Sequence, residues 1–345
     1  MGNKKTKKKK GCSSIFLTII FLIVMVFGAF FGYRVYENGG DLSAILMTIF
    51  GQTPETLENL ETINVLVLGV SEDLGIKLTD TIMVCTYNPK KQTASMLSIP
   101  RDTFTGKDKH AGKWTDKINA LYTKSPEKIM AAVSDITGIN IDYYAVINTE
   151  AVVNIVDIIG GVDFDVPIDM KYDDPTQNLH IDLKKGMQKI DGKKAEQLLR
   201  FRHNNNGTSY PWQYGDNDYG RMKTQRNFII ETVKQTIKLR NIPKLGNLAK
   251  EVFNNIETNL TQEQILSYIP HIVKLNPDEI DSQQLPGVSE KCNEIWFFIY
   301  SRKETAELIK EMTYRIENGT IEEEIIDEEE NNSATNSTNT NSNTN

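Results

Sequence analysis

The chain has 345 residues, a formal net charge of −7 and three cysteines. Its length allows one large domain or two small ones, and 39% hydrophobic with 25% charged residues is typical of a globular protein. Lysines are concentrated in the first ten residues, and acidic residues are concentrated in 322–330. The net charge of the chain therefore says little about the partners of the domain between them. No CxxC motif is present, and we interpret Cys85 and Cys292 as two separate buried thiols.

An apolar segment over residues 15–33 follows the lysines. A helix needs about 20 apolar residues to cross the hydrocarbon core of a bilayer, and the core of a typical signal peptide is shorter. Because lysines before such a segment stay in the cytoplasm, we predict one transmembrane signal anchor, with residues 1–14 in the cytoplasm and the C-terminal domain outside the cell. A cleaved signal peptide is the alternative. The cytoplasmic head carries no recognition helix, so nucleic acid is not an expected partner.

Composition divides the rest of the chain into four parts. We expect a linker over 34–61, a main domain over 62–240, a helical C-terminal extension of that domain over 241–319, and an acidic, Asn/Ser/Thr-rich disordered tail over 320–345.

Helical and strand patterns alternate along the main domain. Three apolar runs of strand length come first, and further elements follow in chain order: strands over 63–70, 81–87 and 95–99, a helix over 126–137, a strand over 142–147, a helix over 150–159, a strand over 162–166, weak strand signals over 169–189, a short helix over 191–199, a loop over 204–215 and a long amphipathic helix over 219–239. Capping boxes at Thr261 and Ser301 open two more helices. This alternation predicts an α/β fold in which helices pack on a sheet.

Charged side chains occur where these elements begin or end. The clusters are Asp80 in LTDT, Arg101 and Asp102 in IPRDT, Arg200 and Arg202 in LLRFRH, and Asp218 and Arg221 in DYGRMKTQR. Each cluster taken alone is also consistent with ordinary solvated charges. Arginines suit bidentate phosphate contacts, and carboxylates bind Mg²⁺ together with waters and phosphate oxygens.

Taken jointly, the clusters predict a site for an anionic ligand and a metal ion, with the groups that phosphoryl transfer requires. The sequence has no P-loop and no GxGxxG motif, so a soluble nucleotide is not indicated. The histidines show no metal-ligand spacing, and we interpret His203, beside the arginines, as structural.

The order of these segments resembles the LytR–CpsA–Psr family. The resemblance covers roughly residues 62–240 and rests on NVLVLGV, LTDTIMV, SIPRDT, KINALY, IDYYAVIN, IIGGVDFDV, LLRFRH and DYGRMKTQR. It implies an α-β-α sandwich in which helices flank a mixed central sheet and enclose an apolar polyprenyl pocket, preceded by one transmembrane helix. It also implies Mg²⁺-dependent transfer of a teichoic acid, capsule or similar anionic glycopolymer from an undecaprenyl-pyrophosphate carrier to peptidoglycan.

The same resemblance implies roles for the charged residues. Asp80 is expected to bind the metal, Asp218 is a candidate base, and Asp102 is expected to orient Arg101. The residues expected to bind pyrophosphate are Arg101, Arg200, Arg202 and Arg221.

The chain departs from the family pattern at two positions. Ser71 stands where the family usually has an aspartate, and Leu78 stands where it usually has an arginine. Glu72 or Asp73 is then the candidate for a second metal-binding carboxylate. Two other functions stay open: a polyprenyl-pyrophosphate hydrolase that uses water as acceptor, and a non-enzymatic lipid-binding regulator of cell-wall gene expression.

Overall fold

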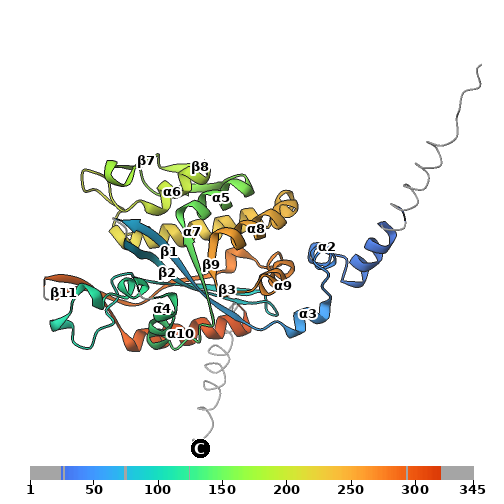
Figure 1. The fold of residues 1–345 in the computed structure, drawn as a ribbon, viewed down its shortest axis with the longest axis horizontal. Coiled ribbons are helices and arrows are strands. Elements are labelled where there is room, and N and C mark those ends of the chain that lie inside the picture. Colours follow the sequence, from blue (N-terminus) through green and yellow to red (C-terminus); the bar gives the residue numbers. More distant parts are fainter. Residues whose placement is uncertain (1–24, 26–27, 74–75, 124, 293, 320–345) are drawn as a thin grey trace, which may run out of the picture.

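A mixed six-stranded sheet forms the centre of the molecule, with helices on both faces (Figure 1). The computed structural model describes residue 25 and residues 28–73, 76–123, 125–292 and 294–319. The strand order is β10-β3-β2-β1-β4-β9. The strands are β1 (Ile63–Asp73), β2 (Ile76–Asn88), β3 (Thr93–Ile99), β4 (Tyr143–Asn148), β9 (Ile256–Thr258) and β10 (Asp281–Gln284).

Two hydrophobic cores lie on opposite sides of this sheet. The helices are α2 (Leu42–Ile49), α3 (Pro54–Asn59), α4 (Pro126–Thr137), α5 (Thr149–Ile159), α6 (Gly192–Arg200), α7 (Asn217–Thr236), α8 (Leu245–Asn255), α9 (Gln262–Ile272) and α10 (Arg302–Asn318). On one face, α4 and α10 pack with the sheet into one core. On the other face, α5, α6 and α7 form the second core (Figure 1).

Two small hairpins complete the second core. They pair β5 (Val162–Val166) with β8 (Gly186–Ile190), and β6 (Met170–Asp174) with β7 (Leu179–Leu183). In β5 the side chains of Val162, Phe164 and Val166 are buried and the aspartates between them are exposed. This alternation follows from the two-residue repeat of a strand with one covered face. A third hairpin, β11 (Gly287–Cys292) with β12 (Ile295–Tyr300), lies at the left of Figure 1.

Local sequence signals fix several element ends where they were predicted. Helix α4 begins at Pro126 and ends before Gly138, whose φ of 73° is left-handed. Helix α5 is capped by Asn148, and α9 carries the predicted capping box at Thr261. Helices α4 and α9 therefore confirm the predictions made from capping residues, whereas the Asn148 cap of α5 was not predicted.

The pairing of the first three strands brings distant charges to one edge of the sheet. Because β2 runs antiparallel to both β1 and β3, the beginning of β2 lies beside the ends of its two neighbours. The register skips one residue there: Gly69 pairs with Thr81 and Val70 with Thr79, which leaves Asp80 as the extra residue of a β-bulge. A bulge redirects the side chain it carries. The bulge therefore places Asp80 at the edge of the sheet where Arg101 follows β3.

Two parts of the chain contain elements that were not predicted. The expected linker over 34–61 contains α2 and α3, and Gln52 donates to the backbone oxygen of Leu266 in α9 at 2.9 Å. The extension over 241–319 is not purely helical, because it supplies β9, β10 and the β11–β12 hairpin. These strands are short or rich in polar residues, so their alternation was too weak to predict them.

The transmembrane segment was predicted over 15–33. Residues 15–24 and 26–27 of it lie outside the described residues. Within the part of the chain that the structure describes, no helix has both the length and the apolar character needed to cross a bilayer.

The contact between α5 and α6 predicts a difference between two glycine substitutions. A Cβ at Gly192 would overlap the carbonyl oxygen of Val153, whereas a Cβ at Gly246 meets nothing within 4 Å. We expect Gly192→Ala to lower the free energy of unfolding by about 1–3 kcal/mol. Gly246→Ala, the matched control in α8, should raise it by about 0.4–1 kcal/mol. Urea unfolding of both variants checks this, and equal effects would contradict the packing.

Candidate active site

Asp218 lies at the centre of a cluster of three arginines. Its carboxylate lies 2.8 Å from Nη2 of Arg221, 3.4 Å from Nε of Arg202 and 3.7 Å from Nε of Arg101. Asp218 and Arg221 are three residues apart in the first turns of α7, so they share one face of the helix. The other two arginines follow β3 and α6. One carboxylate therefore joins three separate segments of the fold.

The site carries more positive than negative charge. Asp80, on the β2 bulge, forms an ion pair with Arg101. Three guanidinium groups and two carboxylates give a formal charge of 3 − 2 = +1. The Arg221 side chain is only 7% exposed, so water screens the charge of this guanidinium poorly. A bound anion would neutralise the excess charge.

Burial and neighbouring charges act differently on two of the arginines. Burial lowers the pKa of Arg221 below its ordinary value against the opposing effect of Asp218, and Arg101 lowers it further. Burial also acts to lower the pKa of Arg101, but Asp218 and Asp80 outweigh it and the pKa of Arg101 is raised. Both groups stay cationic at neutral pH. The two arginines therefore differ mainly in burial, which dominates at Arg221 and is outweighed by the two carboxylates at Arg101.

Unpaired hydrogen-bond donors also suit the site to an anionic ligand. Among the described residues, the buried Nε atoms of Arg101 and Arg221 have no hydrogen-bond partner. Leaving a buried donor of a charged group unpaired costs about 1–3 kcal/mol or more. Phosphate oxygens are suitable acceptors for such donors.

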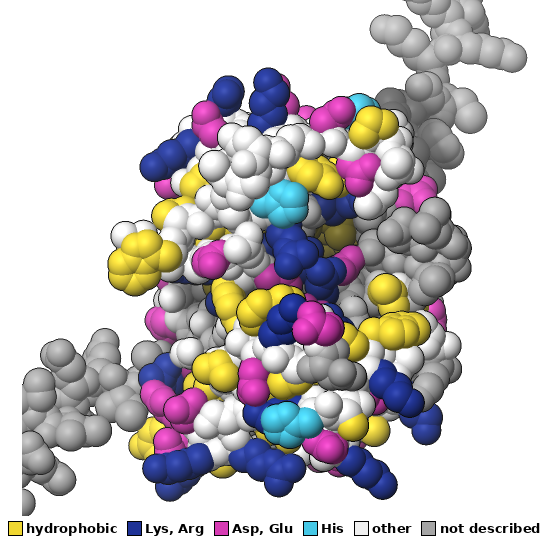
Figure 2. All heavy atoms as spheres, turned by 90° about the vertical axis from the view of Figure 1, so that its left-hand side faces the viewer, with side chains coloured by type: hydrophobic (Ala, Val, Ile, Leu, Met, Phe, Trp, Pro, Cys, Tyr) yellow, Lys and Arg dark blue, Asp and Glu magenta, His cyan; other side chains and the backbone are white. Residues whose placement is uncertain are grey.

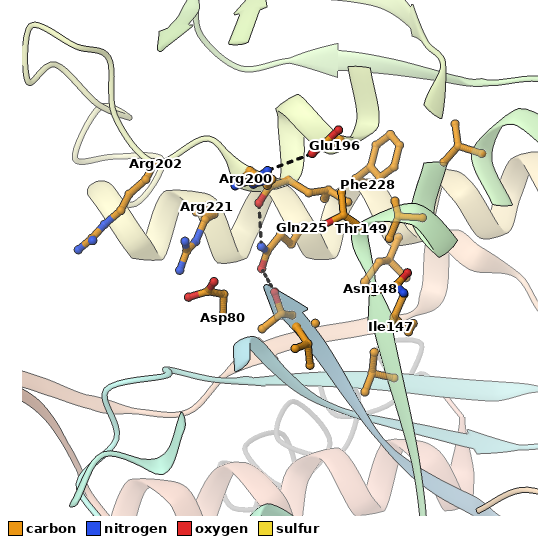
Figure 3. Close-up of a pocket in the computed structure, with 18 of the residues that line it drawn as sticks. Asp80, Ile147, Asn148, Thr149, Glu196, Arg200, Arg202, Arg221, Gln225 and Phe228 are labelled. Carbon is orange, nitrogen blue, oxygen red and sulfur yellow. Dashed lines mark hydrogen bonds and ion pairs between the residues drawn. The ribbon is translucent and has the colours of Figure 1, made fainter. Parts of the chain in front are cut away.

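The cluster stands at the mouth of a cavity of about 490 Å³. In Figure 2, basic side chains gather around the hollow that opens on this face. In Figure 3, Arg202, Arg221 and Asp80 lie at one end of the pocket, and Ile147 and Phe228 lie toward the other. The apolar part of the lining comes from β1, β4, α5, α6, α7 and β7: Val67, Val70, Ile147, Val152, Ile155, Val156, Leu179, Leu199, Phe228, Ile229 and Val233. The cavity thus has a cationic mouth and an apolar interior.

Arg200 lies in the pocket wall but away from the cluster around Asp218. It ends α6, where its guanidinium contacts Glu196 at 3.0 Å and Gln177 at 2.7 Å (Figure 3). Arg200 and Arg202 do not share one extended segment, because helix α6 continues through Arg200.

Two further acidic residues were expected to contribute to the site, Asp102 and Asp73. The carboxylate of Asp102 forms its ion pair with Lys117, at 2.8 Å, rather than with Arg101. Asp102 still contributes to the raised pKa of Arg101 through its charge. The side chain of Asp73, the candidate second metal ligand, lies outside the described part of the structure.

Gln225 is a site residue that the sequence analysis missed. Its Nε2 donates to the backbone oxygen of Leu199 at 3.0 Å, and its Oε1 accepts from Thr81 at 3.2 Å (Figure 3). Gln225 therefore ties α7 to both β2 and the end of α6. Its spacing of four residues from Arg221, on the same helix face, was the signal that could have identified it.

The described residues hold no group of three or more His, Cys, Asp or Glu side chains that could bind a metal ion. Mg²⁺, however, is often held by one or two protein carboxylates and completed by waters and phosphate oxygens. Asp80 lines the mouth of the cavity and offers such a carboxylate beside the arginines. The residues present therefore fit a Mg²⁺ ion that is shared with a phosphate ligand.

The contacts of Asp218 predict opposite effects on stability and on anion binding. Asp218→Asn removes one negative charge, so we expect the free energy of unfolding to fall by about 1–3 kcal/mol. The freed guanidinium groups should bind inorganic pyrophosphate more tightly, giving a larger pyrophosphate-induced rise in Tm than in the unmodified chain. Asp135→Asn, on an exposed position of α4, is the matched control. An unchanged Tm for Asp218→Asn would show that this carboxylate does not stabilise the arginine cluster.

The LytR_cpsA_psr family model matches residues 41–314. Two similar relatives are polyisoprenyl-teichoic acid–peptidoglycan teichoic acid transferases TagU. The one from Bacillus subtilis (strain 168) is 29% identical over 324 residues, which are 92% of this chain and 100% of the relative. The one from Bacillus licheniformis is 27% identical, over 90% of this chain and 98% of the relative.

Solved structures show the same fold. The crystal structure of B. subtilis TagV matches with a TM-score of 0.61 and 25% identity, over 74% of this chain and 98% of that chain. A structure of TagT bound to LIIa-WTA matches with a TM-score of 0.56 and 22% identity, over 74% of this chain and 91% of that chain. The resemblance noted from the sequence covered roughly residues 62–240. The family match extends beyond this range at both ends. From its sequence and its fold, the chain belongs to the LytR–CpsA–Psr family.

Proposed function

We propose that this chain transfers a glycopolymer of the teichoic acid class from an undecaprenyl-pyrophosphate carrier to peptidoglycan, as a membrane-anchored enzyme outside the cytoplasm. Its similarity to the TagU transferases, over nearly the whole of both chains, supports the reaction class. The observation that carries the proposal is the cluster of three arginines around Asp218 at the mouth of an apolar cavity. A lipid pyrophosphate matches this arrangement, because it combines an anionic headgroup with an apolar chain.

The arginines bind and neutralise the pyrophosphate. Arg101, Arg202 and Arg221 have donors near one point, and two of them have unused Nε atoms. As the bond between the two phosphates breaks, negative charge grows on the prenyl phosphate that leaves. Guanidinium groups already fixed in place stabilise that charge without further reorganisation. Arg200, held by Glu196, supports the wall of the pocket beside the headgroup.

The two acidic residues have different tasks. Asp218 keeps the three arginines together in the absence of substrate. Asp80 would hold a Mg²⁺ ion, which when bound would neutralise negative charge on the phosphate groups. Asp102, through Lys117, holds the turn that carries Arg101.

A membrane anchor suits this substrate. The donor lipid stays in the bilayer, and the apolar segment over 15–33 would hold the enzyme at the same surface. Tethering raises the effective concentration of donor and enzyme for each other. Outside the cytoplasm the reaction needs no ATP, because the pyrophosphate bond is already activated.

Removal of single arginines tests the headgroup site. We expect Arg101→Ala and Arg221→Ala each to reduce transfer by at least about 100-fold, since each removes a fixed positive charge from the developing anion. Both variants should keep the circular dichroism spectrum of the folded chain. Arg302→Ala, at an exposed position of α10, is the matched control and should keep full activity. Normal transfer by both site variants would refute the assignment.

The same assay separates transfer from its two rivals. A hydrolase would release product equally with and without a peptidoglycan acceptor. A lipid-binding regulator would retain polyprenyl phosphate but show no turnover in either condition. A transferase forms the polymer–peptidoglycan linkage only when the acceptor is present.

Filling the apolar cavity tests the lipid site separately. Val152 lines the cavity from α5 and is half-buried. We expect Val152→Trp to weaken binding of a long-chain prenyl pyrophosphate by about 10-fold or more, because the indole occupies space that the chain needs. Binding of inorganic pyrophosphate, measured by calorimetry, should stay unchanged. An equal loss for both ligands, or for neither, would show that the chain does not enter this cavity.

A further inference from the structure

The carboxylates at the site are already engaged by arginines. Asp218 contacts three guanidinium groups, and Asp80 contacts Arg101. Transfer to a sugar hydroxyl nevertheless needs a group that accepts the hydroxyl proton. We therefore searched the mouth of the cavity for a side chain with a free acceptor atom.

His203 has such an atom. It directly follows Arg202 and lines the same cavity. Its Nδ1 lies 3.0 Å from the backbone oxygen of Asn204. A carbonyl oxygen only accepts hydrogen bonds, so Nδ1 carries the proton in the neutral ring and Nε2 carries the lone pair. Within the described ranges, Nε2 has no hydrogen-bond partner.

The imidazole is held in place from two sides. Tyr172 of β6 packs edge-on against it, with ring centroids 5.5 Å apart, and the backbone of His203 forms a bridge with Ser209. The charged groups that line the same cavity are Arg202 on its own segment, Glu196 and Arg200 on α6, Arg221 on α7, and Asp80 and Arg101 at the edge of the sheet.

We propose that His203 is the general base of the transfer reaction and takes its proton from the acceptor hydroxyl at Nε2. This rests on the function proposed above. The hydroxyl oxygen forms a bond to the phosphorus that carries the glycopolymer, and its proton moves to Nε2. The bond from that phosphorus to the bridging oxygen breaks, and prenyl phosphate leaves with the electron pair. The imidazolium then returns its proton to solvent.

Two substitutions separate this role from a structural one. His203→Asn keeps an amide donor near the position of Nδ1, so it can maintain the contact with Asn204, but it removes the proton acceptor. His203→Ala leaves space that free imidazole can enter. His110→Asn, on an exposed histidine outside the cavity, is the matched control.

The assay uses the full chain with a short-chain prenyl-pyrophosphate saccharide as donor and a soluble peptidoglycan glycan fragment as acceptor. We expect His203→Asn to lower kcat by about 100- to 10,000-fold with little change in the donor KM. The decline of kcat toward low pH should disappear in this variant, and added imidazole should partly restore the rate of His203→Ala. His110→Asn should behave like the unmodified chain.

Other outcomes overturn the assignment. An unchanged kcat and pH profile for His203→Asn would show that another group accepts the proton. A loss of kcat that imidazole does not rescue, with the low-pH decline retained, would show that His203 only supports the structure. If the unmodified chain binds the donor but never transfers it, the proposed function fails first and this proposal fails with it.

Discussion

The site depends on the contacts of a single carboxylate. Asp218 attracts three guanidinium groups that the chain delivers from the end of β3, from the segment after α6 and from α7 itself. Without that carboxylate, three neighbouring cations, two of them largely buried, would repel one another. With it, the cluster is stable yet still carries an excess positive charge. The folded protein is thus ready for an anion before the anion arrives.

Helix α7 couples the two halves of the binding site. Its first turn carries Asp218 and Arg221 at the mouth of the cavity, and Phe228, Ile229 and Val233 farther along line the apolar interior. Gln225 lies between these two groups and fixes the helix to β2 and α6. In the proposed complex, a single rigid element would set the distance between the headgroup and the start of the lipid chain. Binding energy from the lipid chain can in this way help to position the phosphate groups for reaction.

The sequence allowed the layered α/β fold and the charged clusters to be predicted, because both depend on local signals. Apolar runs identified the first strands, and capping residues such as Asn148 and Thr261 mark helix ends in the structure. The partners of each charge depend on strand register and helix docking, which a sequence does not display. The bulge at Asp80 and the pairing of Asp102 with Lys117 are of this kind. Short polar strands such as β10 were missed because tertiary pairing, rather than their own pattern, makes them strands.

The most direct test of the central claim is a crystal structure of the chain with a bound prenyl pyrophosphate. The account predicts that the diphosphate contacts Arg101, Arg202 and Arg221 together and that the prenyl chain runs into the cavity beside Phe228. A diphosphate bound at another surface, or a prenyl chain that stays outside the cavity while the arginines hold only Asp218, would contradict it.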